Sequence, residues 1–103
     1  MTDWPFPHPE NTACMTVRQV LQDGQPILYV TRDVDDGMFQ FLTGGSVTTE
    51  DAKLVSLGSM LSHDDTLRGV AGLSLGASAT RADSEGPWKW SLPFQSMPTP
   101  TTP

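Results

Sequence analysis

Apolar and polar residues alternate along two stretches of the chain that each lead into an Asp-Gly pair. Asp-Gly favours the two-residue hairpin loop because both positions adopt a positive φ there. With Asp23-Gly24 at the first turn and Asp36-Gly37 at the second, the pattern predicts a three-stranded meander. Its strands are expected at residues 13–21, 26–34 and 38–43.

The two turns also predict a register for this meander. The first turn gives three cross-strand pairs: Val20 with Ile27, Arg18 with Tyr29, and Val17 with Val30. The second turn gives three more: Val34 with Phe39, Arg32 with Phe41, and Thr31 with Leu42. Because Pro26 has no N–H to donate to the ladder, a longer first loop that shifts every pairing is the alternative.

The hydrophobic period changes after Gly44-Gly45. Thr48 followed by Glu50-Asp51 is typical of a capped helix start with acids in its first turn. Leucines then follow at i, i+3 and i+7 (Leu54, Leu57 and Leu61), which predicts a helix with one apolar face. The alternative for residues 54–57 is a short buried strand.

The remaining pattern completes an α+β fold. Thr66 to Ala71 is expected to form a second helical turn with Leu67 and Val70 facing the core, and residues 77–83 a last strand. Gly86-Pro87-Trp88 is expected to turn Trp88 and Trp90 back onto the core. The predicted architecture is a small antiparallel sheet, the meander plus the later strand, with one or two short helices on one face.

The two ends of the 103-residue chain differ from its middle. Residues 1–10 form a proline-rich arm, extended because each proline fixes its own φ and restricts the residue before it. The arm is either a ligand for another protein or, as we prefer, a segment whose Trp4 and Phe6 dock on the domain. Residues 11–90 are expected to form one domain and residues 91–103 a disordered Pro/Thr tail.

Charge and cysteine content exclude several classes of function. Six Lys and Arg stand against twelve Asp and Glu, a net charge of −6. This balance argues against binding to nucleic acid or to an anionic membrane, which both require clustered bases. Cys14 is the only cysteine, so no intramolecular disulfide forms, and the first ten residues lack the pattern of a signal peptide. A cytoplasmic location is expected.

Two motifs resemble known sites without meeting their requirements. Gly72-Leu73-Ser74-Leu75-Gly76 spells G-x-S-x-G, but no histidine follows Ser74, so we interpret the glycines as a turn. An EF-hand loop beginning at Asp33 needs glycine at its sixth place and an acid at its twelfth, where Met38 and Gly44 stand. We therefore expect no catalytic residue, no metal and no cofactor.

His63 and Asp64 carry the alternative interpretation, a small-molecule or weak catalytic site. Neighbours in sequence are not oriented as a general-base system requires. Asp64 or Asp65 is better explained as the cap of the next helical turn, and His63 as an exposed connector.

The strongest candidate for a binding site is the second hairpin loop, where Asp33, Asp35 and Asp36 place three carboxylates within four residues. Such a patch suits a partner that is rich in Lys and Arg. Arg32 and Arg81 are expected to be structural partners of these acids. An unpaired edge strand can also pair with a copy of itself, so the expected state is a monomer or a homodimer.

Residues 14–88 resemble a family of short bacterial domains of unknown function, grouped with immunity-protein-like domains of polymorphic toxin systems. The residues that carry this likeness are Pro26 to Val30 with Arg32-Asp33; Asp36-Gly37 with Phe39-Gln40-Phe41 and Gly44-Gly45; Leu57-Gly58; Asp64 with Leu67; Leu75-Gly76 with Ala79 and Arg81; and Gly86-Pro87-Trp88. The family often has large aromatics where Phe39, Ala77 and Thr80 stand, and a proline at Asp65. The resemblance implies a non-enzymatic cytoplasmic protein that binds and neutralises a basic, toxin-like partner.

Overall fold

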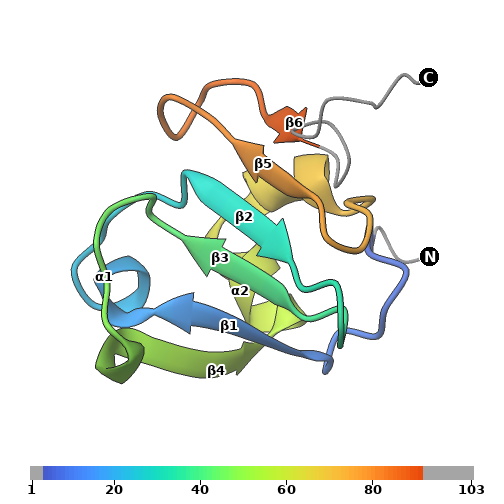
Figure 1. Ribbon diagram of the computed structural model, residues 1–103, viewed down its shortest axis with the longest axis horizontal. Coiled ribbons are helices and arrows are strands. Elements are labelled where there is room, and N and C mark those ends of the chain that lie inside the picture. Colours follow the sequence, from blue (N-terminus) through green and yellow to red (C-terminus); the bar gives the residue numbers. More distant parts are fainter. Residues whose placement is uncertain (1–3, 92–103) are drawn as a thin grey trace, which may run out of the picture.

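A six-stranded sheet with short helices organises the computed structural model, which describes residues 4–91 (Figure 1). The strand order is β4-β1-β3-β2-β5-β6, and every neighbouring pair is antiparallel except β1 with β3. The strands are β1 (Ala13–Val17), β2 (Tyr29–Arg32), β3 (Phe39–Leu42), β4 (Ala52–Ser56), β5 (Ser78–Thr80) and β6 (Lys89–Ser91). The α+β class is confirmed, but the sheet is larger than predicted and mixed rather than purely antiparallel.

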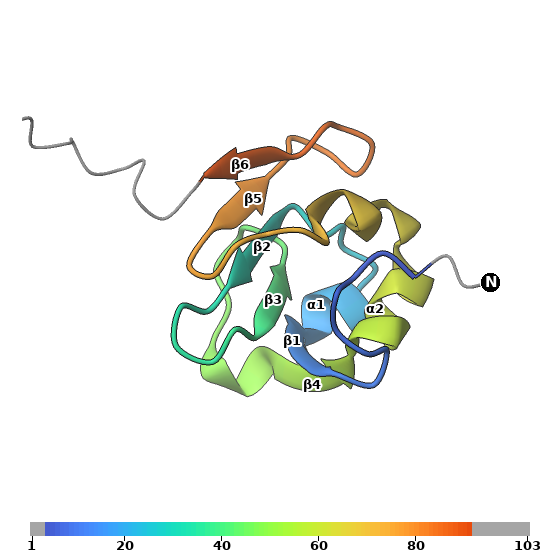
Figure 2. The ribbon, with the colours of Figure 1, turned by 90° about the vertical axis from the view of Figure 1, so that its right-hand side faces the viewer.

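The helical segments are short. They are α1 (Arg18–Leu21), α2 (Leu57–His63) and two 3₁₀ helices, η1 (Thr49–Asp51) and η2 (Asp65–Val70). Figure 2 shows α2, η2 and the N-terminal arm together on one side of the sheet. The core lies between this layer and the sheet, with Phe39, Phe41, Leu57 and Leu67 among its fully buried side chains. Of the predicted tail, Ser91 belongs to β6, and the rest lies outside the described residues.

The first predicted hairpin is wrong. The chain leaves the sheet at Val17, turns through α1, and returns only at Tyr29, so none of the three expected pairs forms. Gly24 has a φ of +70°, as the Asp-Gly signal requires, but it ends a helical turn, which the Gln25 N–H closes on the Gln19 carbonyl. A positive-φ glycine serves a helix end as well as a hairpin, so the signal did not distinguish them.

β1 therefore pairs with strands that follow later in the sequence. Met15 lies opposite Gln40 of β3 in parallel and opposite Leu54 of β4 in antiparallel orientation.

The second predicted hairpin exists, with its register shifted by two residues. Arg32 pairs with Phe39, not Phe41, and the expected pairs of Val34 with Phe39 and Thr31 with Leu42 are absent. The loop holds four residues, 34–37, instead of two, because the Asp33 N–H bonds the Met38 carbonyl. A shift of two keeps every side chain on its face, so Phe39 and Phe41 are buried as expected.

The segment after Gly45 combines both alternatives. Thr48 caps a helix start as predicted, but that helix is the single turn η1. Residues 54–56 then belong to strand β4, and α2 begins at Leu57. The expected apolar stripe is wrong at Leu54, which is 67% exposed on the strand, and correct at Leu57 and Leu61, which are buried.

The C-terminal half follows the prediction more closely. η2 buries Leu67 and Val70 and is capped by Asp64, whose Oδ1 accepts the Thr66 N–H. The last predicted strand is shorter, β5 alone, and β6 was not expected. Trp88 packs against the core as predicted, whereas Trp90 is 41% exposed.

The packing of Trp88 explains why residue 69 is a glycine. Its Cδ1 would lie 2.8 Å from a Cβ at Gly69, so only glycine leaves room for the indole over η2.

The described part of the proline-rich arm, residues 4–10, docks on the domain as predicted, and residues 1–3 lie outside the described residues. Phe6 is 5% exposed, and its ring meets Phe39 edge-on with 5.3 Å between centroids. Trp4 lies beside Phe6 with the two rings tilted by 41°, and it donates its indole N–H to the His8 carbonyl at 2.6 Å. The arm therefore closes the core at the end of the sheet where β2 and β3 meet.

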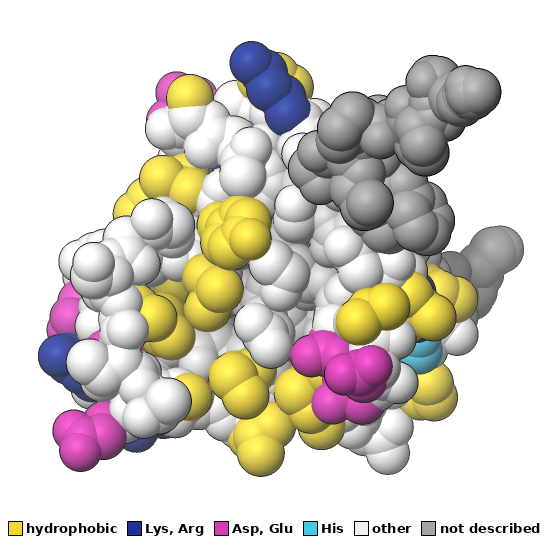
Figure 3. Space-filling model, viewed as in Figure 1, with side chains coloured by type: hydrophobic (Ala, Val, Ile, Leu, Met, Phe, Trp, Pro, Cys, Tyr) yellow, Lys and Arg dark blue, Asp and Glu magenta, His cyan; other side chains and the backbone are white. Residues whose placement is uncertain are grey.

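The other face of the sheet is not covered by any described helix. Its side chains include Met15, Tyr29, Gln40 and Leu42, and among the described strand residues on this face Lys89 is the one with a charge. Figure 3 shows apolar side chains running across this face, with an acidic cluster at the end where the β2–β3 loop lies.

Replacing Phe6 with alanine is expected to destabilise the protein by about 3 kcal/mol, because it removes a buried ring and leaves a cavity under Phe39. Val34→Ala, at a position that is 64% exposed, is the control and should change stability by about 0.5 kcal/mol or less. Denaturant unfolding of the three proteins measures both values. Equal stabilities would show that the arm is not part of the core.

The carboxylate of Asp51 links η1 to α1 through hydrogen bonds. Its Oδ2 accepts the Thr48 N–H at 3.0 Å and the Gln19 Nε2 at 3.1 Å, and its Oδ1 accepts the Arg18 Nε at 3.0 Å. These interactions, the Thr48 amide first, lower the pKa of Asp51 from 3.8 to about 2. A hydrogen-bonded carboxylate favours its ionised form in this way.

This pKa predicts a pH dependence of stability. A carboxyl whose pKa is lower in the folded state stabilises the fold above its unfolded pKa and loses that contribution as it is protonated. The stability difference between the wild type and Asp51→Asn should therefore be constant above about pH 4 and shrink as the pH falls towards 2. Urea unfolding across this range tests the prediction, and two parallel stability curves would refute it.

Candidate functional site

The acidic loop, residues 33–37 between β2 and β3, is held in shape by its own carboxylates. Asp33 Oδ1 accepts the N–H of Asp35 at 2.7 Å and of Asp36 at 3.3 Å. Asp36 Oδ1 accepts the Met38 N–H at 2.8 Å, and Gly37, with φ +74°, bonds the Asp33 carbonyl. Asp and Asn favour such turns because the side chain replaces a backbone acceptor. Asp35 makes no such bond among the described residues and is exposed.

The two arginines expected to pair with these acids do not do so. Arg81 is buried, its NH2 lies 2.9 Å from Asp64 Oδ2, and its guanidinium lies over the Trp88 ring. Arg32 bonds the Gly37 and Leu73 carbonyls and contacts His8 instead of an acid. Within residues 4–91, no Lys, Arg or His side chain forms an ion pair with Asp33, Asp35 or Asp36.

Arg32 connects three segments of the chain. Its Nε donates to the Gly37 carbonyl at 3.1 Å, its NH1 to the Leu73 carbonyl at 3.0 Å, and its NH2 contacts His8 Nε2 at 3.1 Å. It also lies over the Phe39 ring. The acidic loop, the turn after η2 and the N-terminal arm therefore meet at one guanidinium.

The contact with Arg32 determines the role of one His8 nitrogen. A guanidinium only donates hydrogen bonds, so the Nε2 of His8 accepts from Arg32. The other ring nitrogen, Nδ1, is buried and has no hydrogen-bond partner among the described residues.

Apolar side chains border the acidic loop. Val34 at its tip is 64% exposed and Leu75 is 48% exposed. Leu75 lies against Gly37, where a Cβ would be 3.3 Å from the leucine Cδ2. The loop thus combines three carboxylates with two partly exposed aliphatic groups.

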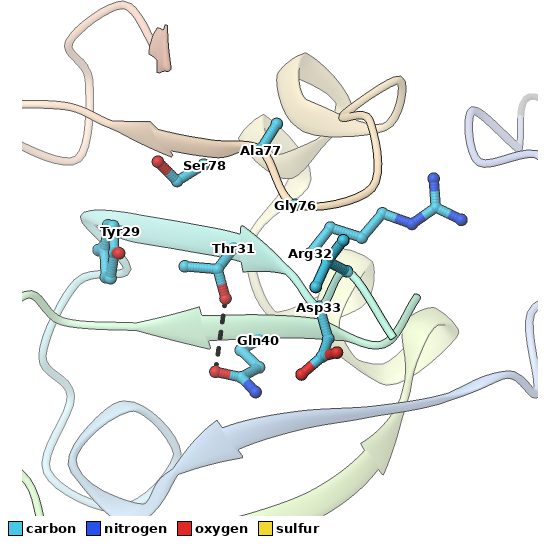
Figure 4. A pocket seen from close by; sticks show the side chains of 9 residues that line it. Tyr29, Thr31, Arg32, Asp33, Gln40, Gly76, Ala77 and Ser78 are labelled. Atoms are coloured by element: carbon cyan, nitrogen blue, oxygen red, sulfur yellow. Dashed lines mark hydrogen bonds between the residues drawn. The ribbon is translucent and has the colours of Figure 1, made fainter. Parts of the chain in front are cut away.

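A hollow of about 490 Å³ lies beside the loop on the uncovered face of the sheet (Figure 4). Asp33 and Val34 line it next to the loop, and the strand residues Tyr29, Thr31 and Gln40 are among its other lining residues, together with the segment 76–78 before and within β5. Thr31 Oγ1 donates to Gln40 Oε1 at 3.4 Å, and Figure 4 shows Arg32 extending away from both. The hollow has a mixed polar and apolar lining, to which Arg32 also contributes, and Asp33 supplies a negative charge at its rim.

At the alternative site, His63 and Asp64, neighbouring groups bond the carboxylate of Asp64. Asp64 Oδ1 accepts from Thr66, and its Oδ2 accepts from Arg81 at 2.9 Å. His63 is exposed at the end of α2. Both oxygens of the proposed partner are therefore occupied by structural bonds, and the capping role predicted for Asp64 is confirmed.

Ser74 and Cys14 are the other groups in the sequence with possible chemical reactivity. Ser74 lies in the turn between η2 and β5 with no helix after it, as the interpretation of the glycines required. Burial raises the pKa of the Cys14 thiol to about 12, so it stays protonated at neutral pH. In the described part of the chain no three His, Cys, Asp or Glu side chains gather as metal ligands. No described helix has the length and apolar character to cross a membrane.

The sequence located the acidic loop but not what holds it. The contact of Arg32 with His8 joins residues 24 positions apart, and neither residue belongs to a recognisable motif. The sequence signal for the role of Arg32 is its position directly before the acidic turn. That position suggests an ion pair with the acids rather than the contacts that Arg32 makes in the structure.

Comparison with known proteins gives no relative: no protein-family model, curated protein or solved structure matches this chain. The resemblance to immunity-protein-like domains therefore stays a prediction.

Replacing Arg32 with methionine is expected to cost about 2 kcal/mol of stability, because the Gly37 and Leu73 carbonyls lose their donors. Amide exchange in residues 33–38 should accelerate at the same time. Arg68→Met, which removes a surface pair with the 75% exposed Asp65, is the control and should cost at most about 1 kcal/mol. Unchanged loop exchange in Arg32→Met would show that the guanidinium does not hold the loop.

Proposed function

We propose that this protein is a non-enzymatic binding module that recognises a basic protein partner through Asp33, Asp35 and Asp36. The observation that carries the proposal is the lack of compensation: three exposed or half-exposed carboxylates share one loop, and no described cation pairs with them. Arg18 and Arg81 form their ion pairs with acids outside this loop, Asp23 and Asp64.

Electrostatics favours a partner that is rich in Lys and Arg. The loop adds its charge to a protein whose net charge is already −6, so a basic surface is attracted over a distance and an acidic one is repelled. Complementary charge of this kind raises the association rate and selects the partner.

The rigidity of the loop supports the same function. The carboxylates of Asp33 and Asp36 accept backbone N–H groups of the turn. Arg32 donates a further hydrogen bond to the Gly37 carbonyl. A loop that is already ordered loses little conformational entropy on binding, so more of the interaction energy remains as affinity.

Val34 and Leu75 supply the apolar part of the surface. Charged pairs at the rim of an interface contribute little, whereas side chains that become fully desolvated at its centre contribute most. A basic partner that presents an apolar group between its cations would cover both aliphatic side chains.

The biological role we propose is neutralisation of a toxin-like protein in the cytoplasm. This part rests on the resemblance of residues 14–88 to immunity-protein-like domains and on a fold with one buried, protonated thiol, which suits a reducing compartment. Binding alone neutralises a partner when it covers that partner's active surface, so no catalytic group is required here.

A charge reversal tests the proposal. The tagged protein is used to capture a basic protein from lysate of its own cells, and the affinity for the purified partner is then measured by calorimetry at several salt concentrations. Asp35→Lys should weaken binding at least about tenfold and flatten its salt dependence. Asp35 caps no backbone group in the described structure, so the loop itself should persist.

Glu85→Lys is the matched control, because Glu85 is also exposed in a turn and the change in net charge is the same. It should alter the affinity less than about twofold. Equal losses in the two variants would mean that only net charge matters, and a partner that binds Asp35→Lys as tightly as the wild type would refute the proposal.

A further inference from the structure

Strand β4 forms one edge of the sheet. Among the described strands it pairs with β1 alone, and Figures 1 and 2 show no described element beyond its outer side. The opposite edge, β6, leads directly into residues that are not described. The edge strand that can be examined in full is therefore β4.

The hydrogen bonds to β1 determine which backbone groups of β4 face outwards. The Leu57 N–H donates to the Thr12 carbonyl at 2.9 Å, directly beyond the pair of Ser56 with Ala13. In an antiparallel ladder, alternate residues turn their N–H and C=O to the same neighbour. Val55 and Lys53 therefore bond β1 as Leu57 does, and the backbone groups of Ala52, Leu54 and Ser56 face outwards.

Two of these outward groups are already used within the chain. The Ala52 N–H donates to the Thr49 carbonyl at the end of η1. Ser56 is the N-cap of α2, and the carbonyl of an N-cap accepts the first bond of its helix. The groups that remain are the N–H and C=O of Leu54, the C=O of Ala52 and the N–H of Ser56.

These four groups can all be paired by a second copy of the same strand that is related by a two-fold axis at Leu54. In an antiparallel pair of two copies centred there, Leu54 exchanges both of its bonds with Leu54 of the second copy. The Ser56 N–H of each copy then meets the Ala52 carbonyl of the other. Every free group finds a partner, and no group that is already bonded is needed.

We propose that β4 pairs with β4 of a second copy of this chain, in antiparallel orientation with Leu54 opposite Leu54. The contact is isologous, so it closes at a dimer and joins the two sheets into one.

The side chains of β4 agree with this register. Leu54 is, at 67%, the most exposed large hydrophobic residue that the structure describes, and it lies on the uncovered face beside Met15. Pairing buries it against its copy. On the other face Lys53 lies opposite Val55 of the second copy, where its methylene chain covers the valine while its ammonium reaches water.

Charge also favours this edge. Two copies with a net charge of −6 each repel one another wherever their acids meet. Residues 52–56 contain no acid and one base, Lys53, so the two strands approach without juxtaposed carboxylates.

Sedimentation equilibrium of the full chain tests the pairing. We expect a concentration-dependent mass that approaches two 11.2 kDa chains at about 1 mM, where even a contact with a millimolar Kd is substantially formed. Leu54→Pro should abolish the dimer, because it removes an outward N–H and no bond within the chain. Leu54→Asp should abolish it by placing two carboxylates at the axis.

Val34→Asp is the matched control, with a similar exposure of 64% in the β2–β3 loop rather than on β4, and should dimerise like the wild type. Amide exchange tests the register: the Leu54 and Ser56 amides should exchange more slowly as the protein concentration rises. A monomer at every concentration, or a dimer that survives both Leu54 substitutions, would overturn the proposal. Leu54→Asp decides the outcome if Leu54→Pro fails to fold.

Discussion

The guanidinium of Arg32 is the interaction on which the functional end of the molecule depends. It binds the Gly37 carbonyl of the acidic loop, the Leu73 carbonyl of the turn after η2, and His8 of the N-terminal arm. Each of these segments is irregular, and the guanidinium is the group that contacts all three. A planar group with several fixed donors can hold three acceptors at once, which an ammonium group cannot do with the same geometry.

This use of Arg32 has an electrostatic consequence. The nearest base to Asp33, Asp35 and Asp36 is turned towards the arm, so the loop keeps its negative charge while it gains rigidity. The same arrangement orders the surface and leaves it without a counterion among the described residues. A binding surface requires both properties, whereas a loop that serves only to connect two strands requires neither.

The sequence predicted local features well and the order of the strands poorly. The α+β class, the cap at Thr48, the η2 turn and the buried Phe39 and Phe41 follow from nearest neighbours and alternation. The parallel pairing of β1 with β3 does not, because the Asp23-Gly24 signal fits a helix end as well as a hairpin.

In the candidate site, too, the sequence predicts the local feature but not the contacts that the fold creates. Three carboxylates in one loop are visible in the sequence, but the partners of Arg32 and Arg81 depend on segments brought together by the fold. The free groups of the β4 edge are hidden for the same reason, since they follow from where η1 ends and α2 begins.

The proposed function requires an ordered loop whose carboxylates, without an ion pair among the described residues, bind a basic partner. Hydrogen exchange of the complex, compared with the free protein, measures where that partner lies. We expect slowed exchange at residues 33–38 and around Leu75, with the β4 edge unchanged by the partner. Protection confined to another surface, with exchange in the acidic loop unaltered, would contradict it.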